Sequence, residues 1–276
     1  MKNVLGLILC TLLFAITASA QTNRSTVTKT VVIPFGMGGT VTLIGAERGD
    51  VSIESWEKTD VEIVAVVENE AADILTLEKM RTVNGFVTEE GLGRIIVSTA
   101  SIRDKAVLKK LGVKLGKESE SAKFSISYSI KVPRYTGLIV NGGSGDLKIK
   151  GVDGDIRINF LEGEAEVSLV GGTLDAVIGS GNLTVSINTR GWRGRAVSAQ
   201  VARGTLNAIL PSNLDAELDA SVENGRIENS FRNLKPKART EFSERSIVGI
   251  AGNGGVPVRL NVASGKILIS EKPSAP

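Results

Sequence analysis

Few side chains in this sequence could take part in chemistry, and the residue types that are missing exclude several kinds of catalytic and metal site. The 276-residue sequence contains no histidine, and its only cysteine is Cys10. Ser-His-Asp and Cys-His catalysis need the missing imidazole, and a zinc site built on nitrogen or sulfur needs ligands that the chain after Cys10 lacks. We therefore predict no catalytic residues, no cofactor and no metal ligands, and we predict that the protein is not an enzyme.

Calcium needs only oxygen ligands, and residues 141–146 (Asn-Gly-Gly-Ser-Gly-Asp) invite comparison with the nonapeptides of calcium-binding β-rolls. The aspartate comes one residue early, and threonine, asparagine or lysine replaces the acid in other copies of this segment. A regular ladder of carboxylates is therefore absent from the sequence. The pattern favours a structural role, in which the polar side chain hydrogen-bonds to the backbone of a turn.

One charged set has the composition of a polysaccharide-cleaving site. Asp153, Asp155 and Arg157 place two carboxylates and a guanidinium at alternate positions. Parallel β-helix enzymes that cleave acidic polysaccharides use such groups on an outer face. Charges on the outside of this kind of fold are mostly solvated, so the set supports an alternative function only.

A second set could contact a ligand without catalysis. The run Gly-Trp-Arg-Gly-Arg at 191–195 brings Trp192 close to Arg193 and Arg195. A tryptophan beside arginines can stack on a sugar or bind an anion, so we predict these three residues as ligand contacts. The alternative is that Trp192 packs against the end of a coil and that both arginines are solvated.

An internal repeat reveals the elements that must position these residues. Residues 145–189 divide into five nine-residue segments, each headed by a glycine: Gly145, Gly154, Gly163, Gly172 and Gly181. The third and fifth positions are apolar in every copy: Leu147, Ile156, Ala165, Leu174 and Leu183, then Ile149, Ile158, Val167, Ala176 and Val185. The fourth position is polar throughout: Lys148, Arg157, Glu166, Asp175 and Thr184. This alternation is typical of a strand with one buried face, and the glycines are typical of tight corners.

A unit of nine residues cannot bury a face alone, so successive units must stack. If two units make one coil, the chain winds through roughly 18 residues per turn, with aliphatic ladders inside; a three-sided coil remains open. The predicted fold class is therefore all-β: a single-domain parallel β-solenoid, or β-helix, with an irregular β-rich N-terminal part.

The first twenty residues are typical of a secretory signal peptide. Lys2 precedes an apolar run over 4–16, and Ala18-Ser19-Ala20 follows as a small-residue exit. We predict cleavage after Ala20, and export to the periplasm or the outer cell surface. The mature chain is expected to contain neither a thiol nor a transmembrane segment, so its stability must come from an apolar core.

We predict a short linker at 21–26, the solenoid domain at 27–270 and a tail at 271–276. Within the N-terminal third, the sequence indicates a strand near 75–77 and a hairpin turn at Asn84-Gly85.

Charge is nearly balanced, with 33 basic against 30 acidic residues, which disfavours nucleic-acid binding. The exception is 101–122, which we predict to be a basic insertion loop. The alternative is an amphipathic helix, with Val107, Leu111 and Leu115 on one face and a basic face that touches anionic lipid or polymer; two internal glycines weaken it.

Several motifs together resemble a bacterial family, the putative adhesin family, which is a domain of unknown function. They are Ser-Tyr-Ser-Ile-Lys-Val-Pro at 127–133, the segment 140–147, and the C-terminal segments 218–227, 249–255 and 260–267. The resemblance extends from about Val27 to Ser270. It implies a β-solenoid at the cell envelope, similar to the head domains of auto-transporter adhesins, with no established catalytic residues.

The leading hypothesis is a non-catalytic exported protein of the cell envelope, adhesin-like in binding or scaffolding. Its expected partner is an envelope or extracellular glycan or protein, and pairing of edge strands would allow self-association. One alternative is a carbohydrate-active β-helix enzyme on an acidic polysaccharide. Another is an envelope-stress or regulatory accessory protein that binds a membrane partner through 101–122.

Overall fold

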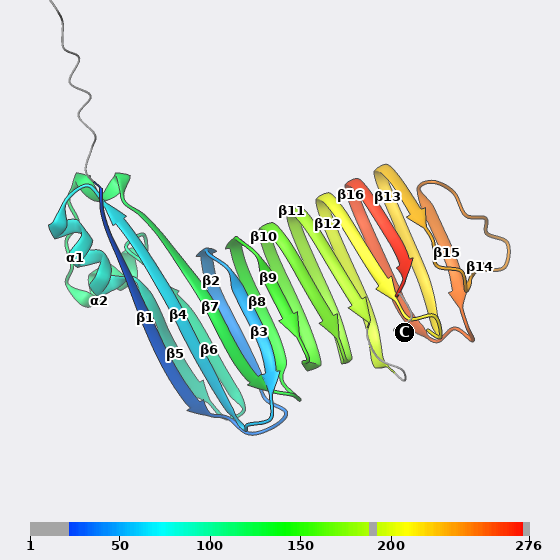
Figure 1. The fold of residues 1–276 in the computed structure, drawn as a ribbon, viewed down its shortest axis with the longest axis horizontal. Coiled ribbons are helices and arrows are strands. Elements are labelled where there is room, and N and C mark those ends of the chain that lie inside the picture. The colour runs from blue at the N-terminus through cyan, green and yellow to red at the C-terminus, as the bar shows by residue number, and fades with distance from the viewer. Residues whose placement is uncertain (1–21, 188–191, 273–276) are drawn as a thin grey trace, which may run out of the picture.

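Strands stacked side by side dominate the protein, whose computed structural model describes residues 22–187 and 192–272 (Figure 1). The predicted signal peptide lies outside these residues. Strands β10 (Asp153–Leu169) and β11 (Gly171–Ile187) run parallel, with Gly154 opposite Gly172 and Gly163 opposite Gly181. Partners are thus 18 residues apart, so one coil holds two nine-residue units and the three-sided alternative is wrong. The predicted parallel β-solenoid is confirmed.

Each coil has two sides, which we call side A and side B. Side A contains β8 (Gly137–Ser144) and the first halves of β10, β11 and β12 (Arg193–Leu210). Side B contains β9 (Leu147–Lys150) and the second halves of the same strands. The predicted inward columns are all buried: Leu147, Ile149, Ala165, Val167, Leu183 and Val185 on side B, and Ile156, Ile158, Leu174 and Ala176 on side A.

The outward residues of the repeat fall on both faces rather than in one ladder. Lys148 pairs with Glu166 at 3.1 Å on side B, whereas Arg157 lies 3.9 Å from Asp175 on side A. The 18-residue period is the reason, because alternate nine-residue units belong to opposite sides.

The corner from side A to side B requires glycine. Gly145, Gly163 and Gly181 have φ of 142°, 142° and 121°, a region that favours glycine. They also stack, since a Cβ on Gly163 would overlap the carbonyl oxygen of Gly145. The same column continues at Gly49, Gly204, Gly265 and Gly225. The opposite corner is less regular, because Gly172 has a positive φ but Gly154 does not.

The N-terminal coil is separated from its neighbour in sequence. Strands β2 (Thr40–Arg48) and β3 (Val51–Trp56) stack directly against β8 and β9. The intervening chain extends the stack with β6 (Arg94–Ala100) next to β2 and β7 (Lys123–Pro133) next to β3.

Antiparallel strands complete this end. They are β5 (Gly85–Gly91) beside β6, β4 (Asp60–Ala71) beside β7, and β1 (Asn23–Pro34) beside β4. Since β1 begins at Asn23, most of the predicted linker at 21–26 is strand.

Two helices lie where the sequence predicted a strand with a hairpin turn and an insertion loop. Helix α1 (Ile74–Val83) covers the predicted strand near 75–77, and Asn84 is its C-cap rather than a hairpin turn. In the predicted loop 101–122, helix α2 (Lys105–Leu111) is followed by the 3-10 helix η1 (Lys117–Ser121). Gly112 ends α2 in a left-handed C-cap with φ 65°, so this glycine terminates the helix rather than weakening its interior.

The C-terminal strands depart from sequential winding. After β13 (Ala216–Asn229), β14 (Leu234–Pro236) and β15 (Ser246–Ala251) close the far end of side A in antiparallel fashion. The last strand, β16 (Val256–Glu271), then inserts between β12 and β13, parallel to both. Figure 1 shows it between the yellow and orange strands.

Candidate functional site

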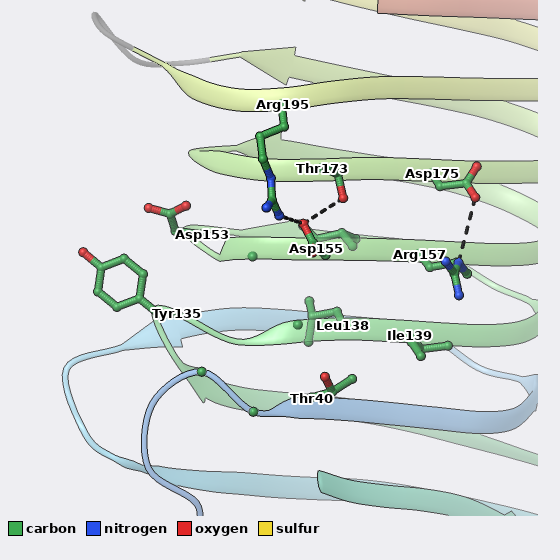
Figure 2. Close-up of a pocket in the computed structure, with 15 residues that line it drawn as sticks. Thr40, Tyr135, Leu138, Ile139, Asp153, Asp155, Arg157, Thr173, Asp175 and Arg195 are labelled. Carbon is green, nitrogen blue, oxygen red and sulfur yellow. Dashed lines mark hydrogen bonds and ion pairs between the residues drawn. The ribbon is translucent and has the colours of Figure 1, made fainter. Parts of the chain in front are cut away.

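A groove of about 390 Å³ lies on the outer face of side A, near the N-terminal coils (Figure 2). Five strands supply its floor, namely β2, β8, β10, β11 and β12, and the turns before β2 and β8 supply one rim. Its polar side chains are Thr40, Tyr135, Asp153, Asp155, Arg157, Thr173, Asp175 and Arg195. Outward positions of parallel strands place side chains from distant coils in rows, so residues 40 and 195 share one site.

Asp155 is the centre of a small network in this groove. Its carboxylate accepts hydrogen bonds from the Arg195 guanidinium and from Thr173 Oγ1, the latter at 2.8 Å. The hydrogen bond from Arg195, followed by the one from Thr173, holds the pKa of Asp155 below its usual value. Asp155 is therefore a carboxylate near neutral pH and accepts hydrogen bonds rather than donating a proton.

Arg195 reaches Asp155 because β12 contains a bulge. Gly194 pairs with Gly172, and Ala196 pairs with Thr173, so Arg195 is one extra residue with no partner in the ladder. In Figure 2 its side chain extends across the neighbouring strand to the carboxylate two coils away. Bulges re-aim side chains and are over-represented beside functional sites, which makes this irregularity the strongest local indication of a site.

The remaining polar groups of the groove extend along the same face. Arg157 Nε lies 3.9 Å from Asp175 Oδ2, with both side chains more than half exposed. Tyr135 is 50% exposed at the rim, and the Arg134 guanidinium lies 5.7 Å from the centre of its ring. The groove thus offers paired charges along an open sheet and one aromatic face at its edge.

The structure separates the three predicted ligand contacts. Arg195 lines the groove and Arg193 is exposed outside it. Trp192 is half-buried against the apolar core, and its ring lies over Gly194, where a Cβ would overlap it. It lines a different cavity of about 340 Å³, with Pro211, Leu214 and Asp215. Whether any of them contacts a ligand stays a prediction.

Asp153, Asp155 and Arg157 do lie together in the groove, as their spacing in one strand requires. Sequence reasoning missed Tyr135, Thr173 and Asp175 as their neighbours. The 18-residue period could have found two of them, because Thr173 and Asp175 follow Asp155 and Arg157 by one coil. Tyr135 precedes the regular repeat and had no such signal.

The polar residues beside the corner glycines have a structural role. Asp50 Oδ1 accepts a hydrogen bond from the backbone amide of Asp146 at 2.9 Å, and Asn182 Oδ1 accepts one from the amide of Thr205 at 3.1 Å. Each bond joins adjacent coils rather than closing the residue's own turn. Among residues 22–187 and 192–272, no group of three or more acidic, cysteine or histidine side chains could hold a metal ion.

Comparisons with solved structures find matches at low sequence identity. A putative cell adhesion protein from Clostridium sporogenes is 12% identical, with 91% of this chain and 100% of that chain covered and a TM-score of 0.49. A putative adhesin from Bacteroides fragilis is 13% identical, with coverage of 88% and 96% and a TM-score of 0.28. A putative lipid binding protein from Parabacteroides distasonis is 10% identical, with coverage of 87% and 96% and a TM-score of 0.26.

No curated protein matches the sequence. A family model does match, over residues 44–270, and its description is Toastrack DUF4097. This match covers most of the chain and confirms the family resemblance that the sequence motifs indicated. The protein therefore belongs to the Toastrack DUF4097 family.

Proposed function

We propose that this protein is an exported, non-catalytic binding protein of the cell envelope, and that the side-A groove binds a glycan without net negative charge. The observation that carries the proposal is the bulge that brings Arg195 onto Asp155 inside an open groove with an aromatic rim. Export is supported by the signal-like residues 1–20.

The chemistry of the groove fits sugar hydroxyls. Carboxylates and guanidinium groups are planar and offer acceptors and donors side by side, which suits the paired hydroxyls of a sugar ring. Tyr135 adds an apolar face on which a ring can rest. A volume of about 390 Å³ is within the usual range for small-ligand sites.

The charge balance of the groove disfavours an acidic polymer. Three carboxylates, from Asp153, Asp155 and Asp175, stand against two guanidinium groups, from Arg157 and Arg195. Each arginine already pairs with one of these acids. A uronic-acid polymer would have to displace those acids, whereas a neutral glycan can add hydroxyl contacts while the ion pairs stay in place.

The same network argues against the carbohydrate-active alternative. Glycoside hydrolysis needs a carboxylic acid with a raised pKa as its proton donor. The pKa of Asp155 is shifted in the opposite direction by Arg195 and Thr173. Asp155 is thus suited to holding a ligand rather than to general acid catalysis.

A glycan array probed with the chain from Gln21 onward tests the proposal, followed by titration calorimetry on any glycan retained. We expect saturable binding to neutral glycans. Tyr135→Ala should weaken it about tenfold, the equivalent of roughly 1.4 kcal/mol. Thr184→Ala, on the outer face of side B, is the matched control and should bind as the wild type does.

Two outcomes would overturn this function. One is an array without any retained neutral glycan, and the other is equal binding by the Tyr135 and Thr184 variants. Release of reducing ends from any polymer, lost in Asp155→Asn, would favour the enzyme instead.

A further inference from the structure

Basic residues outnumber acidic residues at one end of the stack and not in the rest of it. We call residues 72–83 and 101–121, which contain α1 and α2, the helical end. It holds eight basic and five acidic residues, while the rest of the chain after residue 21 holds 24 basic and 25 acidic residues. All eight basic side chains are exposed: Lys79, Arg81, Arg103, Lys105, Lys109, Lys110, Lys114 and Lys117. Figure 1 shows these helices at the end opposite β14 and β15.

Several acids of the helical end are already engaged. Asp73 and Asp104 cap the two helices, their carboxylates accepting hydrogen bonds from backbone amides. Glu78 pairs with Arg81 at 3.0 Å on the same helix. The ion pairs among the described residues involve none of the α2 lysines at 105, 109 and 110. These lysines therefore offer their charge to a partner outside the chain.

Large apolar side chains are exposed among these lysines. Leu75 is 72% exposed, Ile74 61% and Leu111 50%. Lys79 Nζ, one turn after Leu75, donates a hydrogen bond at 2.9 Å to the carbonyl of Lys114, three residues after Leu111. This bond ties α1 to the chain after α2. Exposed leucines and lysine ammonium groups of α1 and α2 are thus held at the same end of the stack.

The chain also enters the fold at this end. Asn23, the first residue of β1, donates a side-chain hydrogen bond at 3.1 Å to the carbonyl of Ala72, two residues before α1 begins. The apolar run 4–16 precedes Asn23 in the sequence by only a few residues. During export, a membrane that holds this run would therefore lie close to the helical end.

We infer that the helical end docks on the surface of an anionic lipid bilayer, with the solenoid pointing away from it. Lysines attract anionic headgroups, while the exposed leucines and isoleucine enter the boundary between headgroups and acyl chains. Docking is interfacial, because no helix of the described residues is long and apolar enough to cross a bilayer. Bound in this way, the side-A face stays accessible.

Vesicle co-sedimentation tests this inference on the chain from Gln21 to Pro276, which contains every described element. The probes are vesicles of phosphatidylglycerol mixed with phosphatidylcholine, and vesicles of phosphatidylcholine alone. We expect binding to the anionic vesicles only. Lys105→Glu, Lys109→Glu and Lys110→Glu together should weaken it at least tenfold, since each basic residue near such a surface contributes about 1 kcal/mol.

The matched control places the same charge change at the opposite end of the stack, with Arg232→Glu, Lys235→Glu and Lys266→Glu. These residues are exposed, and the control should keep the binding of the wild type. Equal loss in both triple variants, or equal binding to both kinds of vesicle, would overturn the inference. So would a complete lack of vesicle binding, or capture of an acidic protein with no vesicle binding.

A fluorescent probe at position 75 distinguishes insertion of the exposed leucines from non-specific electrostatic attraction to the vesicles. The chain after residue 20 has no cysteine, so Leu75→Cys introduces a unique thiol for an environment-sensitive fluorophore. Its emission should shift to the blue on anionic vesicles, whereas the same label at Lys235→Cys should not respond. An unresponsive label at position 75 would reject this orientation. Glycan binding by the side-A groove should be unchanged in the lysine variants, so the two proposals fail independently.

Discussion

Gly163→Ala tests whether the glycine column sets the spacing of the coils. Gly163 has a φ of 142°, and an added Cβ would lie well inside the 3.0 Å below which real Cβ contacts do not occur, against the carbonyl oxygen of Gly145. The backbone conformation alone costs alanine about 1–3 kcal/mol. The overlap with a backbone atom that cannot move aside adds roughly 1–3 kcal/mol, typical of overpacking. We therefore expect a loss of about 2–6 kcal/mol of unfolding free energy.

Gly255→Ala is the control, because its backbone is in a similar region of φ but its surroundings are open. Gly255 has a φ of 119°, and no atom lies within 4 Å of its added Cβ. Its loss should stay near the backbone cost alone, about 1–3 kcal/mol. Urea denaturation of both variants, with the slope of the transition checked against the wild type, measures the difference. If Gly163→Ala costs no more than Gly255→Ala, the close approach of the coils does not explain why glycine occupies this column.

Three further predictions concern individual polar groups. Arg195→Gln should raise the pKa of Asp155 toward the usual value of an aspartate in an NMR titration, because it removes the charged hydrogen-bond donor. The lowered pKa stabilises the fold by less than about 1 kcal/mol, since the pair is exposed. This stabilisation is present above the unfolded-state pKa and is lost as pH falls through the folded-state pKa. Burial raises the pKa of Tyr128 to about 12, so stabilisation by its neutral phenol is lost as pH rises from about 10 through 12. Tyr128→Phe should remove this late step from an ultraviolet titration, and a late step that persists in the variant would contradict it. Asn84→Leu removes hydrogen bonds to Asn69 (2.6 Å) and from the amide of Ile102 (2.9 Å), and should cost about 2–4 kcal/mol in urea and speed hydrogen exchange at 101–111.

The interior of the solenoid could be predicted because it repeats. Ile156 and Leu174 occupy the same position one coil apart, so each copy of the pattern reports on the same buried column. The number of nine-residue units per coil was harder to predict, because a glycine begins every unit whether the coil has two sides or three. Only the pairing of residues 18 apart decides it, and pairing is not visible in the sequence.

The candidate site was only partly predictable, since it depends on departures from the repeat. Arg195 enters the groove through one extra residue in β12, and a bulge leaves no sequence pattern when the flanking strand stays regular. Helix α1 was missed because Ile74 and Leu75 face solvent, so its apolar residues do not follow a single buried helical face. The available sequence signal was Asp73, a residue type that favours helix N-caps. In the structure its Oδ1 accepts a hydrogen bond from the Thr76 amide at 2.8 Å.

The position of β16 shows why the similarity between repeats does not predict the order in which the coils stack. Gly225-Arg226-Ile227 and Gly265-Lys266-Ile267 carry the same corner and strand, so either could stack on β12. The antiparallel strands β14 and β15 occupy the outer edge of side A beside β13, which leaves no parallel position beyond it for the returning chain. β16 therefore inserts between β12 and β13, and buries Val258, Leu260 and Ile267 against both. Since β13 contacts the rest of the stack through this strand, the far end of the solenoid is complete only once residues 256–271 are in place.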